Sequence, residues 1–455
     1  MSTPDHILKN YYLTDINLFL KLAVPLILTG LIEASVVFFS NIFLAHLGPL
    51  ELAAGALVSW LFATLMCIMW GGLSSASVFV ALKLGEKDNQ GIAFVLRDAL
   101  FIALMFMVPA ALLLWYAPPI LLFFGQDPLS VSLATKYLHA LVWAVPPDFT
   151  TLVLFQFLIG LGQTRTVLVF TLLWVPLNIF CNYAFVFGRF HFPNLDIAGI
   201  GWGTSLAYWI TLIGMVIYLF ARPYYRNFLK MIKPFHRPYF YSDLLLVGIP
   251  MGAMYLIEIS FLFILTLLMG RMGNEILAAN QIALQFGGLV FMVLFSAAQG
   301  LAARMGHLLG ADDYQAAERA TYIGVSIMFI LIFISALCYW FLPYQLIGWD
   351  LNVNNPNNAK IISYAKSFLA VSAVFQLLES IRVMLFGSLC ALKDTRFTLI
   401  ISILSFWCIA LPLGYFFSTY GATGFWYGIV IGSTFSSSVL IWRFRFRMKQ
   451  LRRNA

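Results

Sequence analysis

Long runs of apolar residues, separated by short polar segments, dominate this chain of 455 residues. A helix needs about 20 mostly apolar residues to cross a bilayer, and twelve runs are long enough. The runs are continuous and do not alternate between apolar and polar positions, so transmembrane strands are not favoured. We therefore predict twelve membrane-spanning helices, at about residues 17–43, 52–82, 92–117, 134–160, 166–188, 198–221, 242–269, 277–304, 316–342, 362–391, 395–417 and 422–443.

The positive charges between these runs predict how the chain is oriented. Cytoplasmic connections of membrane proteins carry an excess of Lys and Arg. Here most of the 27 basic residues fall in the connections that share a side with both termini. The exceptions are Lys136, Arg189, Arg271, Lys360 and Lys366 on the other side, and Arg382 within a run. We predict a multi-pass protein of the inner (plasma) membrane with both termini in the cytoplasm.

The two halves of the chain repeat one another at a constant spacing. Pro25 and Pro250 lie 225 positions apart, and so do Glu33 and Glu258. The same spacing relates Gly48 to Gly273, Asp88 to Asp313, and Gly199 to Gly424. Each half holds six runs, an even number, so both halves enter the membrane in the same orientation. Repeats of this kind are related by an axis along the membrane normal.

This repeat predicts the organisation of the whole molecule. The expected fold is an all-α polytopic membrane protein with twelve transmembrane helices, in two six-helix lobes related by a pseudo-twofold axis along the membrane normal. Residues 1–221 would form the N-lobe and 242–443 the C-lobe. Between them lies a basic, proline-bearing cytoplasmic linker at 222–241, and residues 444–455 form a basic cytoplasmic tail.

Composition excludes several classes of protein. Hydrophobic residues make up 62% of the chain and charged residues only 10%, against about 25% charged in soluble domains. A soluble enzyme, a disordered chain and a nucleic-acid-binding module are therefore excluded, despite the net charge of +8. The five cysteines all fall in apolar runs without metal-ligand spacing, so we expect neither a disulfide framework nor a structural metal.

Only four acidic residues are predicted to lie well inside the runs. They are Glu33, Asp148, Glu258 and Glu379. A charge at bilayer depth costs at least about 2.5–3.5 kcal/mol, so such residues usually face a cavity and serve function. Glu33 and Glu258 are repeat mates, while Asp148 and Glu379 each precede a Thr-Arg pair by sixteen positions. Each lobe is thus predicted to carry one carboxylate in its first helix and one in its fourth.

These acids have a functional and a structural interpretation. A carboxylate in a low-dielectric site releases its proton more readily when a cation approaches, which couples proton release to cation binding. The four acids are therefore candidates to bind H⁺, Na⁺ or a cationic substrate. Alternatively, they are protonated or hydrogen-bonded and hold helices together. Arg382 lies three residues after Glu379, a candidate ion pair that would keep Glu379 ionised and weaken its case as a proton carrier.

Further candidates are prolines and asparagines inside the runs. Pro25 and Pro250 are expected in the first turns of their spans, whereas Pro176 and Pro412 lie deeper, and all four are candidates for helix bending, static or mobile. Asn178 and Asn182 are one helical turn apart and are candidates for a polar pocket in the N-lobe, or for hydrogen bonding between helices. A Walker A glycine loop, an H-E-x-x-H zinc motif and a Ser-His-Asp set are not found, so we expect no enzyme and no cofactor.

Several segments together resemble the multidrug and toxin extrusion (MATE) transporters, most closely the NorM-like branch. They are Pro250 with Glu258, Ala278-Ala279-Asn280-Gln281, Gly306-His307-Leu308-Leu309-Gly310, and Gly387-Ser388-Leu389 with Lys393-Asp394. The resemblance covers nearly all of the chain. It implies two six-helix bundles that export amphipathic organic cations in exchange for H⁺ or Na⁺ by alternating access. The implied partners are cationic small molecules and the lipid bilayer, and we expect a monomer without nucleic acid.

The resemblance also assigns roles to individual residues. Glu258 matches the seventh-helix glutamate of NorM-like members, and Glu379 matches their tenth-helix acidic position. Many bacterial members carry an aspartate in the first helix where this chain has Ser40, followed by Asn41. That difference puts a cycle centred on this aspartate in doubt, and Glu33 is a candidate to replace it. Phe375 stands where some members have a tyrosine that helps hold a cation, so H⁺ is preferred over Na⁺.

Three other functions remain open at this stage. A lipid or lipid-linked saccharide flippase of the same superfamily would favour basic residues in its cavity, whereas this chain has four membrane acids and one membrane base. An intramembrane enzyme would depend on His307 and Asp312, which stand at a predicted cytoplasmic helix end. A channel is the third alternative, although two repeats with central acids are more typical of alternating access.

Overall fold

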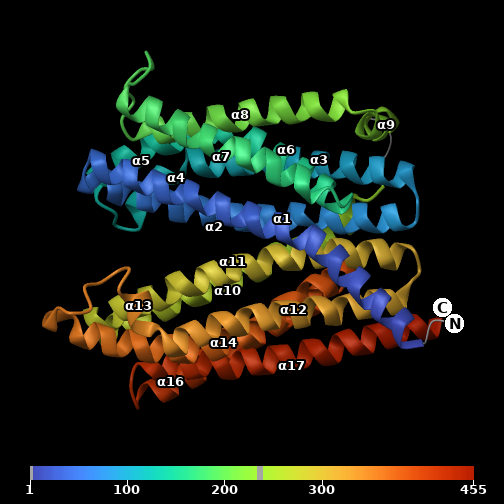
Figure 1. Cartoon of the computed structure of the whole chain (residues 1–455). Coiled ribbons are helices and arrows are strands. Elements are labelled where there is room, and N and C mark those ends of the chain that lie inside the picture. The colour runs from blue at the N-terminus through green and yellow to red at the C-terminus, as the bar shows by residue number, and fades with distance from the viewer. Residues whose placement is uncertain (1–3, 233–238, 455) are drawn as a thin grey trace. The chain divides into compact units, whose positions relative to one another are not determined.

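The computed structural model describes residues 4–232 and 239–454, and the regular structure in these residues is helical. The first repeat contains α1 (Pro4–Leu47), α2 (Pro49–Gly85), α3 (Asn89–Trp115), α4 (Ala117–Phe123), α5 (Pro128–Leu141), α6 (Val145–Gly160), α7 (Thr164–Phe187), α8 (Ala198–Ala221) and α9 (Pro223–Met231). The second contains α10 (Tyr241–Met272), α11 (Asn274–Gly310), α12 (Tyr314–Phe341), α13 (Pro343–Ile347), α14 (Ala359–Ala391), α15 (Thr395–Ile403), α16 (Leu411–Ser418) and α17 (Thr423–Asn454) (Figure 1).

Twelve helical segments of the described residues are long and apolar enough to cross a membrane. Each coincides with one of the twelve predicted runs, so the predicted all-α polytopic fold is confirmed. Three of these segments are composite, and in one of them a 3₁₀ turn (η2, Pro356–Asn358) precedes α14. A short 3₁₀ turn joins α5 to α6, and a π-helix (η3, Leu404–Ala410) joins α15 to α16.

The contacts divide the chain into two compact units, which we call unit 1 and unit 2. Unit 1 consists of residues 1–27 and 253–455, and unit 2 of residues 28–252. The division therefore runs through α1 and α10, whereas the lobes proposed from the repeat meet at the linker 222–241. The beginning of α1 packs with the second repeat, and the beginning of α10 packs with the first.

Pro25 and Pro250 mark the places where the chain passes from one unit to the other. The passage follows Ile27 in α1 and Gly252 in α10. The prediction that both prolines lie in a first helical turn is wrong, because α1 begins at Pro4 and α10 at Tyr241. Pro25 comes 21 residues after the start of α1 and Pro250 nine residues after the start of α10, so each proline lies in a helix interior. A proline there removes one backbone hydrogen bond and favours a bend.

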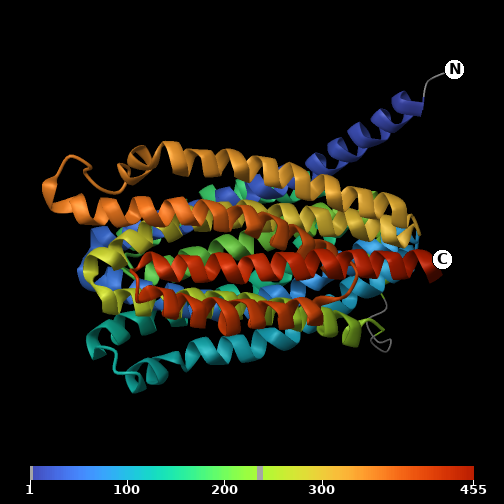
Figure 2. The same cartoon turned by 90° about the horizontal axis from the view of Figure 1, so that it is seen from below.

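One helix is central to each unit. In unit 1, α14 packs against α11, α12 and α17, and these helices run side by side in both views (Figures 1 and 2). In unit 2, α6 packs against α2, α3 and α8. These two helices are the fourth spans of their repeats, and they carry Glu379 and Asp148. The fold therefore places one acidic residue of each unit on its most enclosed helix.

The repeat extends to the geometry of individual turns. Asp88 caps α3 by accepting a hydrogen bond from the Gly91 backbone at 2.8 Å. Its repeat mate Asp313 caps α12 in the same way, at 3.0 Å from the Ala316 nitrogen. Such caps satisfy backbone donors that the first turn of a helix leaves unpaired. The repeat is therefore present in local structure as well as in sequence.

Two further aspartates anchor the helices that pass between the units. In unit 1, Asp15 of α1 is 6% exposed and pairs with Arg304 and Arg319. In unit 2, Asp98 of α3 is 1% exposed and accepts hydrogen bonds from the backbone nitrogens of Tyr239 and Phe240, at 2.8 and 2.7 Å. Neither is among the four predicted membrane acids, although Asp98 lies inside the predicted run 92–117. Asp15 holds the beginning of α1 in place, and Asp98 holds the beginning of α10 in place.

Candidate functional site

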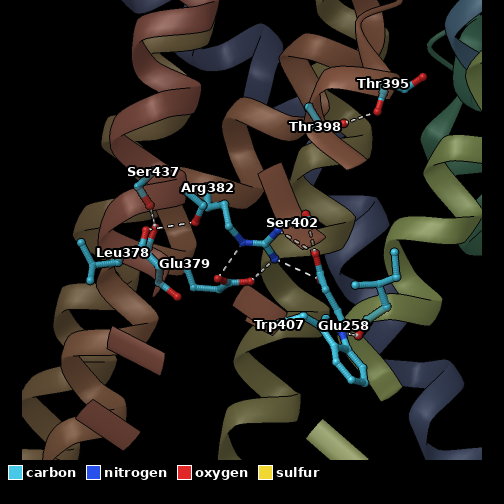
Figure 3. Close-up of polar contacts among 12 residues, drawn as sticks. Glu258, Leu378, Glu379, Arg382, Thr395, Thr398, Ser402, Trp407 and Ser437 are labelled. Atoms are coloured by element: carbon cyan, nitrogen blue, oxygen red, sulfur yellow. Dashed lines mark hydrogen bonds and ion pairs between the residues drawn. The ribbon is translucent and has the colours of Figure 1, made fainter. Parts of the chain in front are cut away.

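The strongest buried charge cluster lies in unit 1 around Arg382. Its side chain is 2% exposed, and its guanidinium contacts two carboxylates (Figure 3). Nη1 and Nη2 donate to Glu258 at 2.7 and 3.1 Å. Nε donates to Glu379 at 2.9 Å, and Nη2 donates to the other oxygen of the same carboxylate. One planar cation thus binds both carboxylates bidentately, the geometry that guanidinium groups favour.

The helices explain how these three residues meet. Glu379 and Arg382 are three residues apart on α14, so their side chains lie on the same face of the helix. Glu258 comes from α10, the first span of the same repeat. The Trp407 indole donates to the Ile257 carbonyl at 3.2 Å, which ties the π-helix to α10 beside Glu258. Three elements of unit 1 therefore fix the cluster.

Two side chains complete the surroundings of the cluster. The Ser402 hydroxyl donates to Glu258 Oε1 at 3.4 Å, a long hydrogen bond. The Phe406 ring lies with its centroid 5.2 Å from the Arg382 Cζ atom, within the range of a cation–π contact. Ser402 lies in the last turn of α15, and Phe406 lies in the π-helix that follows. π-helices are rare and occur frequently at functional sites.

The charges in this cluster do not balance. Two carboxylates face one guanidinium, which leaves a formal charge of −1 when both glutamates are ionised. Each carboxylate oxygen accepts a hydrogen bond from Arg382. With both glutamates ionised, the cluster is therefore satisfied in hydrogen bonds but keeps one net negative charge.

Unit 2 contains a second pair of acids without a cation. Asp148 of α6 is 5% exposed, and Glu33 of α1 is half-buried. The two interact electrostatically. In the described part of the chain, no Lys or Arg forms an ion pair with either of them.

Aromatic and hydroxyl groups surround this second pair. Trp70 of α2 and Tyr208 of α8 face Asp148 with their donor groups, and Thr171 of α7 faces Glu33. Even so, Asp148 Oδ2 and the Thr171 hydroxyl have no hydrogen-bond partner of normal geometry within the described residues. Buried polar atoms are rarely left unsatisfied in folded proteins, and such atoms often mark a functional or hydrated site.

Two of the four residues predicted for an N-lobe polar pocket are hydrogen-bonded to each other. Asn182 Nδ2 donates to Asn178 Oδ1 at 2.9 Å, and both residues are buried in α7. The Thr204 hydroxyl of α8 donates to Asn182 at 3.4 Å, so this pair links two helices. Within the described residues, no hydrogen bond connects it to Ser40, which is half-buried, or to Asn41, which is exposed. The structure therefore joins two members of the predicted set and leaves the other two apart.

The prolines differ in their surroundings. Pro176 lies inside α7, which stays α-helical on both sides. Pro412 follows the π-helix η3 by two residues. A proline lacks the backbone N–H that an α-helix requires, and its ring crowds the preceding turn. The seven-residue π-helix interrupts the α-helical hydrogen bonding at this point, next to the Arg382 cluster.

Sequence reasoning missed several residues at the two sites. Ser402 and Phe406 in unit 1, and Thr171 and Tyr208 in unit 2, were not singled out. One signal was available, because Thr171 and Ser402 lie 231 positions apart, the same spacing as Asp148 and Glu379. The spacing of 231 positions therefore relates Thr171 near one acid pair to Ser402 near the other, and it could have been used to find them. Phe406 had no such signal, since its position depends on the π-helix.

Comparison with known proteins places the chain in a family. The MatE family model matches residues 25–184 and again 250–416, one match in each repeat. A probable multidrug resistance protein NorM of Pseudomonas aeruginosa is 31% identical over 446 residues, covering 96% of this chain and 91% of the relative. A protein of the same name from Burkholderia mallei is 32% identical over 429 residues, covering 93% of this chain and 91% of the relative.

Solved structures agree on the fold. A MATE protein crystallised in a straight conformation superposes with a TM-score of 0.87 at 21% identity, covering 96% of this chain and 97% of its own. A MATE protein in a bent conformation gives a TM-score of 0.85 at 20% identity, covering 98% of each chain. At these identities the structures show the fold alone.

Proposed function

Because the chain belongs to the MATE family of membrane transporters and is NorM-like, we propose that it is a multidrug exporter. In this proposal it exchanges amphipathic organic cations for H⁺ by alternating access. The members of this family are transporters, which confirms the prediction that the chain is not an enzyme. The straight and bent forms known for related folds are compatible with such a cycle.

The observation that carries the proposal is the contrast between the two acid pairs. Both lie in membrane-spanning helices, but among the described residues a Lys or Arg partner is found for Glu258 and Glu379 alone. We assign the cationic substrate to that pair, in competition with Arg382. The coupling proton is assigned to Glu33 and Asp148, which have no competing cation. Each pair would then carry one of the two exchanged charges.

H⁺ suits the second pair better than Na⁺. An indole N–H is a donor only and cannot ligate a metal ion, and Trp70 faces Asp148 with such a group. Among the described residues, no group of three or more His, Cys, Asp or Glu is placed to hold a metal ion. A carboxylate buried in a membrane-spanning segment, as Asp148 is, favours its neutral, protonated form.

The remaining features of the proposal follow from the family and the charges. We propose a monomer in the inner (plasma) membrane with both termini in the cytoplasm. The first turn of α1 and the last turn of α17 lie at the same end of unit 1, in accord with termini on one side (Figures 1 and 2). A flippase for anionic lipids gains no support, since Arg382 is paired with two glutamates.

Counterflow in proteoliposomes tests this function. Uptake of a labelled organic cation is compared under an imposed pH gradient, an Na⁺ gradient and neither. We expect accumulation against the substrate gradient only under the pH gradient, and its loss in Glu33→Gln and Asp148→Asn proteins that remain monodisperse. Accumulation driven by Na⁺ alone would overturn the choice of ion. Equilibration that no gradient affects would indicate a channel.

A further inference from the structure

We propose that Glu258 is a binding site for a guanidinium or amidinium group of the exported molecule, and that Arg382 occupies this site when no substrate is bound. The inference rests on the proposed function and adds the chemical class of the substrate. In this scheme an arriving cation replaces Arg382 at Glu258, while Arg382 remains paired with Glu379.

The first support is the shape of the site. Glu258 receives two N–H groups from one planar cation, at 2.7 and 3.1 Å. This parallel pair of donors is the arrangement by which guanidinium groups bind carboxylates. An amidinium carries the same two donors in one plane. A quaternary ammonium has no N–H group, and Na⁺ has none either, so neither would reproduce these hydrogen bonds.

The second support is the covalent placement of Arg382. It shares α14 with Glu379, three residues away, whereas Glu258 lies 124 positions earlier in the chain on α10. Arg382 can therefore leave Glu258 by a change in the conformation of its long side chain alone. Release from Glu379 would separate two neighbours on one helical face. Glu258 is thus the carboxylate that an incoming cation can take over.

The third support is the charge. The cluster has a formal charge of −1 with Arg382 in place, and a monocation brings it to zero. Each carboxylate would then have its own planar cation, so no ionised group is left unpaired in a buried site, where an unpaired charge is costly. The exchange of one guanidinium for another also preserves the hydrogen bonds of Glu258, which keeps the two states close in energy.

The fourth support is the surface beside the cluster. The face of Phe406 lies 5.2 Å from Arg382 Cζ. Delocalised planar cations stack on aromatic faces more favourably than compact ones. Phe406 belongs to the π-helix η3, and Ser402 at the end of α15 contacts the Glu258 carboxylate at 3.4 Å. Phe406 and Ser402, which surround Arg382 and Glu258, are therefore suited to a second planar cation.

The inference is tested by a binding experiment, without a transport assay, in which free guanidinium takes the place of the Arg382 side chain. Arg382→Ala protein in detergent is titrated with guanidinium chloride up to about 20 mM, at constant ionic strength against tetramethylammonium chloride and against NaCl. A ligand that binds only the folded protein raises its Tm. We expect guanidinium alone to raise the Tm of this variant by at least about 2 °C, with a smaller change in the unmodified protein.

A double variant is the matched control. Glu258→Gln/Arg382→Ala lacks the proposed carboxylate, so guanidinium should no longer stabilise it. The inference is overturned if the double variant responds as strongly as Arg382→Ala, or if tetramethylammonium or Na⁺ stabilises Arg382→Ala as well as guanidinium does. Arg382→Gln is prepared in parallel and is titrated in its place if the alanine variant is not recovered.

A measurement on the unmodified protein does not depend on either variant. An aryl amidinium and an aryl trimethylammonium of similar size are compared as stabilisers in detergent and as substrates in proteoliposomes. We expect half-maximal stabilisation at an at least tenfold lower concentration of the amidinium. Equal values would contradict the inference. Selective binding without transport would instead support the site and contradict the proposed exporter.

Discussion

The two acid pairs occupy equivalent positions in two copies of one repeat, yet they differ in charge. Asp148 and Glu379 lie 231 positions apart on the central helices of their units, and Glu33 and Glu258 lie 225 apart. Three residues after Glu379 comes Arg382, which binds both glutamates. Three residues after Asp148 comes Thr151, whose hydroxyl is buried and has no hydrogen-bond partner within the described residues. One position in the repeat therefore distinguishes a pair of acids bound by a cation from a pair with no Lys or Arg partner among the described residues.

A second position widens this difference. Tyr208 faces Asp148 in unit 2, and the residue 225 positions later is Ser433, which is buried in α17. Unit 2 thus has a large aromatic donor beside its acids where unit 1 has a small residue. The two units share a scaffold and two carboxylates each, and they have diverged in what surrounds those carboxylates. The comparison teaches that repeat symmetry in the fold does not extend to the chemistry of its sites.

The largest effect is expected from removing the cation of unit 1. Arg382→Ala leaves two buried carboxylates without a partner, and such a loss costs about 3–5 kcal/mol of folding free energy. The matched change in unit 2, Thr151→Ala, removes one unpartnered hydroxyl and should alter stability by less than about 1 kcal/mol. Thermal unfolding in detergent at neutral pH, followed by intrinsic fluorescence, measures both. Equal Tm values for the two variants would mean that the cluster contributes nothing to stability.

The next effect concerns the open pair. Asp148→Asn keeps the shape of the side chain but cannot take up a proton, so uptake driven by a pH gradient should fall at least tenfold, about 1.4 kcal/mol. Initial rates in proteoliposomes provide the measurement. Glu51→Gln, a change of an acid in the first turn of α2, is the control and should retain normal rates. Unimpaired transport by Asp148→Asn would remove the coupling role from unit 2.

A smaller effect is expected from copying the arrangement of unit 1 into unit 2. Thr151→Arg places a guanidinium three residues after Asp148, where it can pair with that carboxylate as Arg382 pairs with Glu379. Proton-driven uptake should decrease about threefold, roughly 0.7 kcal/mol, because Glu33 stays available. Thr151→Gln, of similar length but uncharged, controls for volume. If both variants lose activity equally, crowding and not charge is responsible.

The smallest effect is expected at the repeat mates Ser402 and Thr171. The Ser402 hydrogen bond to Glu258 is long, at 3.4 Å, so Ser402→Ala should cost no more than about 0.5–1 kcal/mol. Thr171 makes no hydrogen bond of normal geometry, and Thr171→Val should be neutral or slightly stabilising. Unfolding midpoints resolve the difference. A larger loss for Thr171→Val than for Ser402→Ala would show that Thr171 does hold Glu33.

Much of the fold could be predicted from the sequence, because a bilayer imposes simple requirements on it. The number of spans follows from the lengths of the apolar runs, and the repeat from a constant spacing of 225. The pairing of Glu379 with Arg382 was also predictable, since residues three apart share a helical face. These features depend on local geometry or on periodicity, and both can be read from the sequence.

Other features depend on packing and could not be predicted in this way. The contact of Arg382 with Glu258 joins residues 124 positions apart, and no spacing rule specifies it. The π-helix η3 and the position of Phe406 depend on how α15 and α16 accommodate Pro412. The start of α1 at Pro4 could not be predicted from apolar length either, because the residues between Pro4 and the run at 17–43 are largely polar.

The division of the chain through α1 and α10 has a consequence for the order in which the protein is made. Domains generally fold as units as they emerge during synthesis, N-terminal ones first. Unit 2 ends at residue 252 and has all of its residues at that point, whereas the first 27 residues belong to unit 1, which is incomplete until the chain is nearly finished. Residues 1–27 are therefore made before the rest of the unit to which they belong. Asp15, which pairs with Arg304 and Arg319, is held in place only when the second half of the chain has been made.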